Sequence, residues 1–144
     1  MINSDYHLQE WINLGHALIV PIEIADQLKA KLENLPWNTA GSGIDWKDIP
    51  HKKIKLSEAQ EAREYNFLEG TKLELNQLII FLFGKNDPCL ACGLKFGIEN
   101  IDYAYWKAPG KRYFFGANFD QDRIFPELDS LNEYDGSDTL RLSI

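Results

Sequence analysis

The chain has 144 residues, of which 44% are hydrophobic and 26% are charged, and its net charge at pH 7 is −7. This length and hydrophobic content predict a single domain over residues 1–144 with its own packed core, and they exclude a chain that is disordered throughout. Two cysteines are too few for a disulfide framework, and the acidic balance argues against nucleic acid and anionic lipid as partners.

The cellular location is predicted from the apolar segments. Residues 1–7 contain no basic segment followed by an apolar run, so we expect no export signal. The longest apolar run, residues 78–83, is far shorter than the roughly 20 residues that span a bilayer. We therefore expect a cytoplasmic protein without a membrane partner.

The first part of the chain is predicted to be mainly helical. Apolar residues at helical spacing indicate a helix over residues 4–14, which stops near Gly15. Residues 17–20 are apolar and predict a short buried strand. A second helix is expected to begin at Pro21, which suits a first helical turn, and to end before Pro36.

A long loop is predicted next, over residues 37–55. It is polar and glycine-rich, yet it carries Trp37 and Trp46, and loops of this length in compact domains are often functional. A capping box at residues 57–60 then predicts a third helix over residues 57–68.

The second half is predicted to be rich in strands. Residues 71–84 have helical spacing, but the β-branched and aromatic run at 78–83 favours a buried strand. Residues 103–107 and 112–116 are expected to form a hairpin, and the alternation of residues 139–144 predicts a closing strand. Helices followed by strands indicate an α+β fold, with N-terminal helices packed on a mostly antiparallel C-terminal sheet.

Cys89 and Cys92 form the one motif with a chemical name, a C-x-x-C pair. At the start of a helix such a pair has a lowered thiol pKa and exchanges disulfides, so a small thiol oxidoreductase is one alternative function. If the segment is a strand instead, the two sulfur atoms point to opposite faces and cannot cooperate. Two buried structural cysteines are the interpretation that we favour.

Neither a metal site nor a catalytic site is predicted. His7, His16 and His51 lack the paired spacing of a zinc site. Residues 118–129 alternate oxygen ligands as calcium loops do, but Arg123 stands at the position where the sharp turn needs glycine. We therefore expect no cofactor, and a protein that acts by binding another macromolecule rather than by catalysis.

The predicted binding surface is the acidic stretch near the C-terminus. Residues 113–144 contain seven acidic residues but only Arg123 and Arg141 as basic ones, a local balance of −5. Carboxylates around aromatic anchors suit an interface in which charge steers the approach and buried rings hold the complex, although acidic loops also serve solubility alone. The predicted partner-binding residues are Asp120, Asp122, Glu127, Asp129, Glu133, Tyr134, Asp135, Asp138, Trp37 and Trp46.

Four segments connect the chain to a known class of proteins: residues 35–37 and 44–46 with their tryptophans, residues 106–113, and residues 133–138. A small, acidic, tryptophan-rich α+β chain with these segments resembles the bacterial immunity proteins that neutralise toxins of contact-dependent inhibition and related polymorphic systems. The resemblance implies a one-to-one complex with a cognate toxin domain, often a basic nuclease whose active site is covered. An acidic adaptor or inhibitor of a nucleic-acid enzyme would share the same physics and is a further alternative.

Overall fold

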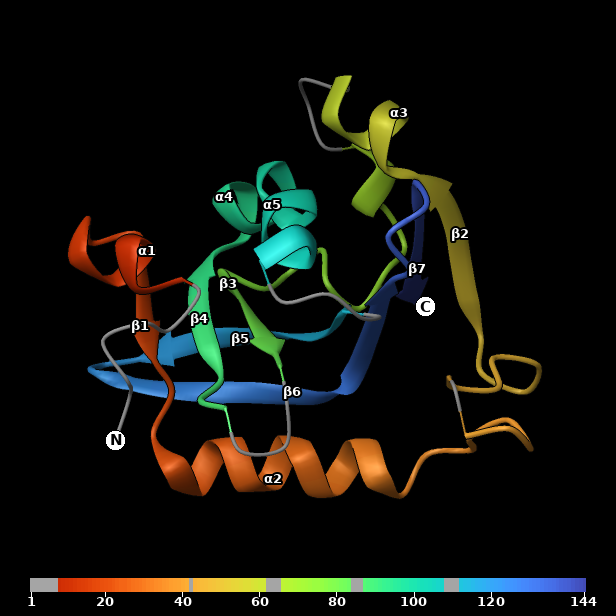
Figure 1. Cartoon of the computed structure of the whole chain (residues 1–144), viewed down its shortest axis with the longest axis horizontal. Coiled ribbons are helices and arrows are strands. Elements are labelled where there is room, and N and C mark those ends of the chain that lie inside the picture. The colour runs from red at the N-terminus through yellow and green to blue at the C-terminus, as the bar shows by residue number, and fades with distance from the viewer. Residues whose placement is uncertain (1–7, 42, 62–65, 84–86, 108–111) are drawn as a thin grey trace.

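The sheet is the centre of the fold in the computed structural model, which describes residues 8–41, 43–61, 66–83, 87–107 and 112–144 (Figure 1). In these residues seven strands pair in the order β1-β4-β3-β5-β6-β7-β2, and every pairing is antiparallel. The predicted α+β class and the antiparallel sheet are therefore confirmed. The strands are β1 Ala17–Ile19, β2 His51–Lys55, β3 Leu78–Leu82, β4 Leu90–Gly93, β5 Arg112–Asp120, β6 Arg123–Tyr134 and β7 Thr139–Ser143.

Helices cover both faces of the sheet. α2 lies along one face, and α1, α4 and α5 lie on the other face (Figure 1). The prediction that the helices precede the sheet is wrong, because α4 and α5 lie between β4 and β5 and the N-terminal strand β1 forms one edge of the sheet. The helices are α1 Gln9–Asn13, α2 Ile22–Glu33, α3 Leu56–Glu61, α4 Leu94–Glu99 and α5 Ile101–Lys107, with a 3₁₀ turn at Asn66–Leu68.

The strand β3 connects two hydrophobic cores. All five of its residues are buried, because alternate side chains of a strand point to opposite faces and both faces are covered here. Ile79 and Phe81 pack with Trp11 in the core beneath α1, α4 and α5. Ile80 joins Leu28 of α2 in the core on the other face. A continuous apolar run is typical of such a doubly covered strand, and the predicted strand within residues 71–84 is confirmed.

Residues 103–107 belong to the helix α5, so the predicted strand there is wrong. The aromatic composition suggested a strand, but Ile101 and Ala104, which are both fully buried and three residues apart, lie on one face of a helix. Tyr103 stacks on Trp11 of α1, with ring centroids 5.8 Å apart. The expected turn at residues 108–111 lies outside the described residues, as do residues 4–7 of the first predicted helix and residues 62–65 of the third.

The predicted loop over residues 37–55 is shorter than expected, because β2 begins at His51. The capping box predicted for α3 is also wrong. The backbone N–H and the hydroxyl of Ser57 donate to the two carboxylate oxygens of Asp138, both at 2.8 Å. The hydrogen-bond acceptor at the start of α3 is therefore Asp138, in the turn between β6 and β7 and 81 positions along the chain. Residue spacing within α3 cannot predict so distant a partner.

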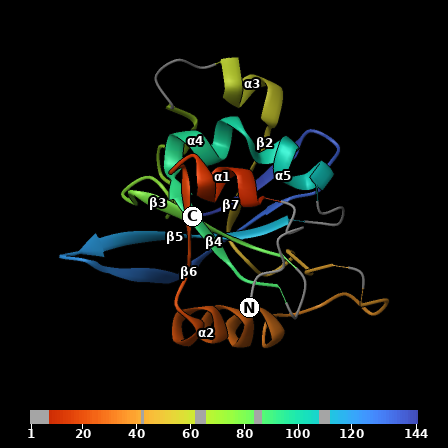
Figure 2. The same cartoon turned by 60° about the vertical axis from the view of Figure 1, so that its left-hand side comes forward.

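The hairpin of β5 and β6 projects beyond its neighbour β3. β3 pairs with residues 113–117 of β5, whereas residues 118–120 pair only with residues 123–125 of the same hairpin. Gln121, with φ of 58°, lies in the tight turn at the tip. Figure 2 shows the two strands extending away from the rest of the sheet. This projection places the hairpin tip in reach of the start of α2.

Candidate functional site

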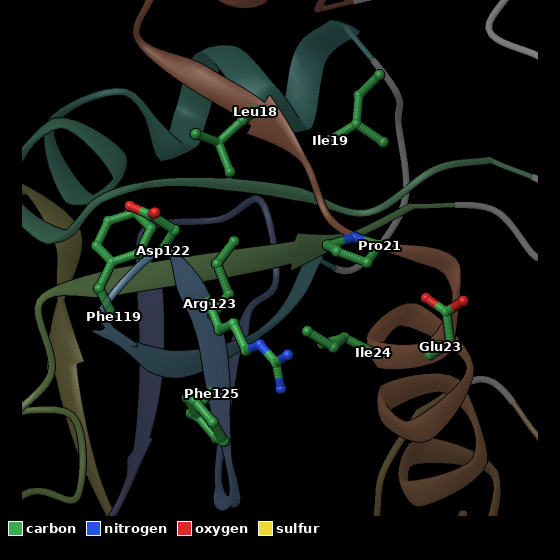
Figure 3. Close-up of a pocket in the computed structure, with 10 residues that line it drawn as sticks. Leu18, Ile19, Pro21, Glu23, Ile24, Phe119, Asp122, Arg123 and Phe125 are labelled. Atoms are coloured by element: carbon green, nitrogen blue, oxygen red, sulfur yellow. The ribbon is translucent and has the colours of Figure 1, made fainter.

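A surface groove lies between β1, the start of α2 and the tip of the β5–β6 hairpin (Figure 3). Its volume is about 670 Å³. Four large apolar side chains that line it are strongly exposed: Leu18 at 44%, Ile19 at 45%, Phe119 at 44% and Phe125 at 50%. Exposed apolar residues that line one hollow, rather than lying singly over the surface, are typical of a site that binds another molecule.

Charged side chains line the same groove. Glu23 comes from α2, and Asp122 and Arg123 come from the hairpin tip. Asp120 is exposed at the end of β5, where it pairs in register with Arg123. Figure 3 shows the guanidinium of Arg123 pointing toward Ile24 of α2. An apolar patch with a charged rim is the usual construction of a protein–protein interface.

The groove opens at β1 because this strand is the edge of the sheet. Only Ala17 of β1 is buried. The predicted strand at residues 17–20 is therefore confirmed, but the prediction that Leu18 and Ile19 are buried is wrong. Gly15, at φ of 78°, ends α1. Pro21 then fixes the turn into α2. The exposed strand is therefore held between two sharp changes of direction.

The predicted acidic surface is divided between the two ends of β6. Asp120 and Asp122 lie at the hairpin tip beside the groove, whereas Asp135 and Asp138 lie in the turn between β6 and β7. β6 has 12 residues, and at roughly 3.3 Å per residue its path length is about 40 Å. The structure does not bring these four carboxylates together on one surface.

The predicted residues along β6 and in the tryptophan loop have mixed exposure. Glu127 and Asp129 are exposed, and Asp129 Oδ1 lies 3.6 Å from Lys31 Nζ on α2. Trp37 is 37% exposed and contacts the ring of Tyr113 edge-on. Trp46 is only 5% exposed and belongs to the core on the α2 face. Of the two tryptophans, therefore, Trp37 alone reaches the surface.

The remaining predicted residues have partners inside the protein. The hydroxyl of Tyr134 donates to Asp102 Oδ1 at 2.6 Å, and burial raises the pKa of this tyrosine. Asp135 Oδ1 accepts hydrogen bonds from the backbone of Ser137 at 2.8 Å and of Thr139 at 3.3 Å. Together with the cap that Asp138 provides to α3, these contacts stabilise the turn between β6 and β7. In this conformation Tyr134 is buried and offers no aromatic anchor to a partner.

A partly buried polar network, which was not predicted from the sequence, runs across β5, β6 and β7. Tyr113, Glu133 and Arg141 are paired in register on three neighbouring strands. Glu133 Oε2 lies 3.4 Å from Arg141 Nε, and Arg141 Nη1 donates to His51 Nε2 at 3.2 Å. Nδ1 of His51 lies 2.7 Å from the carbonyl oxygen of Ile49. Burial and the charge of Glu133 both raise the pKa of Tyr113.

Glu133 is therefore a structural residue in this conformation rather than part of an acidic surface. It is 2% exposed, and its Oε1 is buried without a hydrogen-bond partner among the described residues. The same is true of Nε1 of Trp46. A buried carboxylate costs free energy unless it is paired, and the ion pair with Arg141 offsets part of this cost.

The two cysteines lie on opposite faces of β4 and its entry. Cys89 packs in the core on the α2 face, and Cys92 packs in the core on the α1 face. Both are free thiols. Burial raises the pKa of Cys89 to about 11 and that of Cys92 to about 12. The geometry therefore gives no support to the alternative of a thiol oxidoreductase, which needs a thiolate near neutral pH.

We expect both thiols to be unreactive in the native protein. With a pKa near 11, about one thiol in a thousand is ionised at pH 8, and both sulfur atoms are also shielded from reagents. Iodoacetamide at pH 8 should label the urea-denatured chain fully before it labels either thiol of the native chain. Native labelling at the rate of an exposed cysteine, measured by intact mass, would restore the redox alternative.

The described part of the chain offers neither a metal site nor a membrane-spanning helix. The described residues contain no group of three or more histidine, cysteine or acidic side chains that could hold a metal ion. No helix within the described ranges is long and apolar enough to cross a membrane. No protein-family model matches the chain, and neither does any curated protein. The groove and its charged rim form the candidate binding site.

Proposed function

We propose that the chain is an immunity-type protein that binds and neutralises a basic toxin domain in the cytoplasm, through the groove at the hairpin tip. The observation that carries this proposal is that four exposed apolar residues line one groove, with carboxylates at its rim. Apolar side chains that a partner can bury supply affinity. Carboxylates supply attraction for a positively charged partner.

The electrostatics of the chain favour a basic partner. The net charge is −7, and among the residues that line the groove Glu23 and Asp122 outnumber Arg123. A field of this sign accelerates the association of a basic protein, by factors of about 10 to 1,000 at low ionic strength. Rapid capture suits a protein that must inactivate a toxin before the toxin reaches its substrate.

A stable interface needs more surface than the groove alone. Specific complexes bury about 800 Å² on each partner. Ile22, at the first residue of α2, is 66% exposed beside the groove. Glu127 is exposed on β6 further along the hairpin. We propose that the interface extends over both, so that the acidic surface predicted from the sequence is used at its hairpin end.

The test is association with a cognate toxin domain, which is to be sought among the products of the neighbouring genes. Asp120→Lys combined with Asp122→Lys is expected to lower the association rate constant by about tenfold or more at low salt, and to flatten its salt dependence, because the steering charge is reversed. Surface plasmon resonance at several salt concentrations measures both quantities. Growth of cells that produce the toxin reports whether neutralisation is lost.

The matched control is Glu58→Lys with Glu61→Lys, which changes the net charge by the same amount on the exposed face of α3. α3 lies at the opposite side of the molecule from the hairpin tip (Figure 1). Phe119→Ala with Phe125→Ala should speed dissociation instead, because it removes apolar contacts and leaves the charge unchanged. If the hairpin charge variant associates as fast as the α3 variant, the groove is not the docking site.

A further inference from the structure

The outer edge of β1 has backbone groups that pair with no other strand of the described residues. Val20 N donates to Cys89 O at 3.0 Å, and Leu18 is in register with Ala91. In an antiparallel pair the hydrogen-bonded positions alternate, so the N–H and C=O groups of Ala17 and Ile19 point away from β4. No strand in the described part of the chain pairs with this edge.

The two edges of the sheet differ in how they are protected. β2, at the other edge, carries three lysines in five residues, and edge lysines are a common defence against pairing with another chain. β1 carries no charge, and its Leu18 and Ile19 are 44% and 45% exposed. Among the described residues, the edge of the sheet that adjoins the groove is therefore the one that can accept a further strand.

We propose that a partner segment in extended conformation adds to the edge of β1 as an eighth strand and places alternate side chains in the groove. This inference rests on the proposed function, since it uses the same groove. Addition of a strand to a sheet edge takes its affinity from backbone hydrogen bonds and its specificity from pockets for alternate side chains. β1 has only 3 residues, so the groove supplies the side-chain contacts that so short an edge lacks.

The chemistry of the groove defines the segment. Its apolar lining requires apolar side chains at alternate positions, which are the ones that reach one face of a strand. Glu23 and Asp122 require lysine or arginine beside them. A second copy of this chain fits poorly, because two chains of net charge −7 repel each other. The occupant is therefore a basic, alternating segment of a different protein.

The probe is a library of random twelve-residue peptides displayed on phage and selected against the full chain. We expect selected peptides to alternate apolar residues with lysine or arginine. Synthetic versions that are N-methylated on one alternate set of residues should bind about tenfold more weakly, because they lose the hydrogen bonds to β1. Methylation of the other set, whose amides face outward, should change the dissociation constant by less than about threefold.

Ile19→Pro tests the same contact from the side of the protein. Proline is tolerated on an edge strand where the N–H faces away from the sheet, so the pairing of β1 with β4 is retained. The variant should weaken peptide binding about tenfold, whereas Ile19→Val keeps the N–H and should bind within about twofold of the parent. Thermal unfolding and the amide NMR spectrum establish that both variants keep the fold.

Several results would overturn the inference: no peptide is selected, Ile19→Pro binds peptides as the parent does, or methylation of either set has equal effect. A concentration-dependent dimer in sedimentation velocity that Ile19→Lys abolishes would assign the edge to a second copy instead.

Failure of the proposed function can be distinguished from failure of strand addition. If Phe119→Ala with Phe125→Ala weakens toxin binding and Ile19→Pro does not, the groove binds the toxin without strand addition. If peptides bind β1 but the hairpin substitutions do not change toxin binding, strand addition is supported and the proposed function is not.

Discussion

Arg141→Ala is expected to lower the free energy of unfolding by about 3 kcal/mol, because it leaves the carboxylate of Glu133 buried without its ion pair. The side chain of Glu133 is 3% exposed, and that of Arg141 is 26% exposed. Because the guanidinium is partly solvated, the effect is expected near the lower end of the range of about 3–5 kcal/mol for broken buried pairs. Urea unfolding followed by tryptophan fluorescence measures it.

The double variant Glu133→Leu with Arg141→Ala separates the ion pair from the rest of the packing. It removes both charges, so it should recover most of the stability that Arg141→Ala loses. Arg123→Ala is the matched control, because Arg123 is exposed at the hairpin tip and its loss should cost less than about 0.5 kcal/mol. If Arg141→Ala costs no more than this control, the carboxylate of Glu133 does not depend on Arg141.

The sequence predicted those elements whose pattern reflects a local cause. The apolar run at 78–83 indicated a strand, and β3 is buried on both faces. Proline at position 21 marked the entry to α2. The C-x-x-C pair, taken as a strand, predicted sulfur atoms on opposite faces, and Cys89 and Cys92 lie in different cores. In each case the residues that decide the structure are neighbours along the chain.

The exposure of the acidic residues could not be predicted, because a break in strand register decides it. Phe114 pairs with Asn132 and Gly116 pairs with Glu127, so two steps along β5 correspond to five steps along β6. The extra residues reverse the alternation of β6 between these points. Glu127 therefore remains exposed, whereas Glu133 turns into the core. Regular alternation in the sequence contains no sign of this irregularity.

The groove was missed for a different reason. Leu18 and Phe119 are 101 positions apart, and they line one hollow only because the β5–β6 hairpin projects past β3 toward the start of α2. The sequence places Phe119 and Phe125 beside the predicted acidic residues, but it does not indicate which face of the hairpin either ring occupies. Asp120 and Asp122 were predicted to bind a partner, but the apolar residues of β1 beside them were predicted to be buried.

Phe81→Ala is expected to lower the free energy of unfolding by about 3–5 kcal/mol, through lost burial and a cavity that the surrounding residues fill only in part. Phe81 is fully buried in β3, and its ring lies among Trp11, Phe83 and Phe114, with centroids 6.4, 6.5 and 5.7 Å away. Trp11 belongs to α1, Phe83 follows directly after β3, and Phe114 belongs to β5. The cavity therefore weakens the contact between the helical layer and the sheet, and urea unfolding measures the loss.

Phe81→Leu keeps most of the volume and should cost less than half as much as the alanine variant. Leu75→Ala is the matched control for loss of an apolar side chain, because Leu75 is 86% exposed and its removal should change stability by less than about 0.5 kcal/mol. The hairpin tip is remote from this core, so Phe81→Leu should retain partner binding at temperatures where it is folded. A Phe81→Ala variant as stable as Leu75→Ala would mean that the rings around position 81 do not form one packed unit.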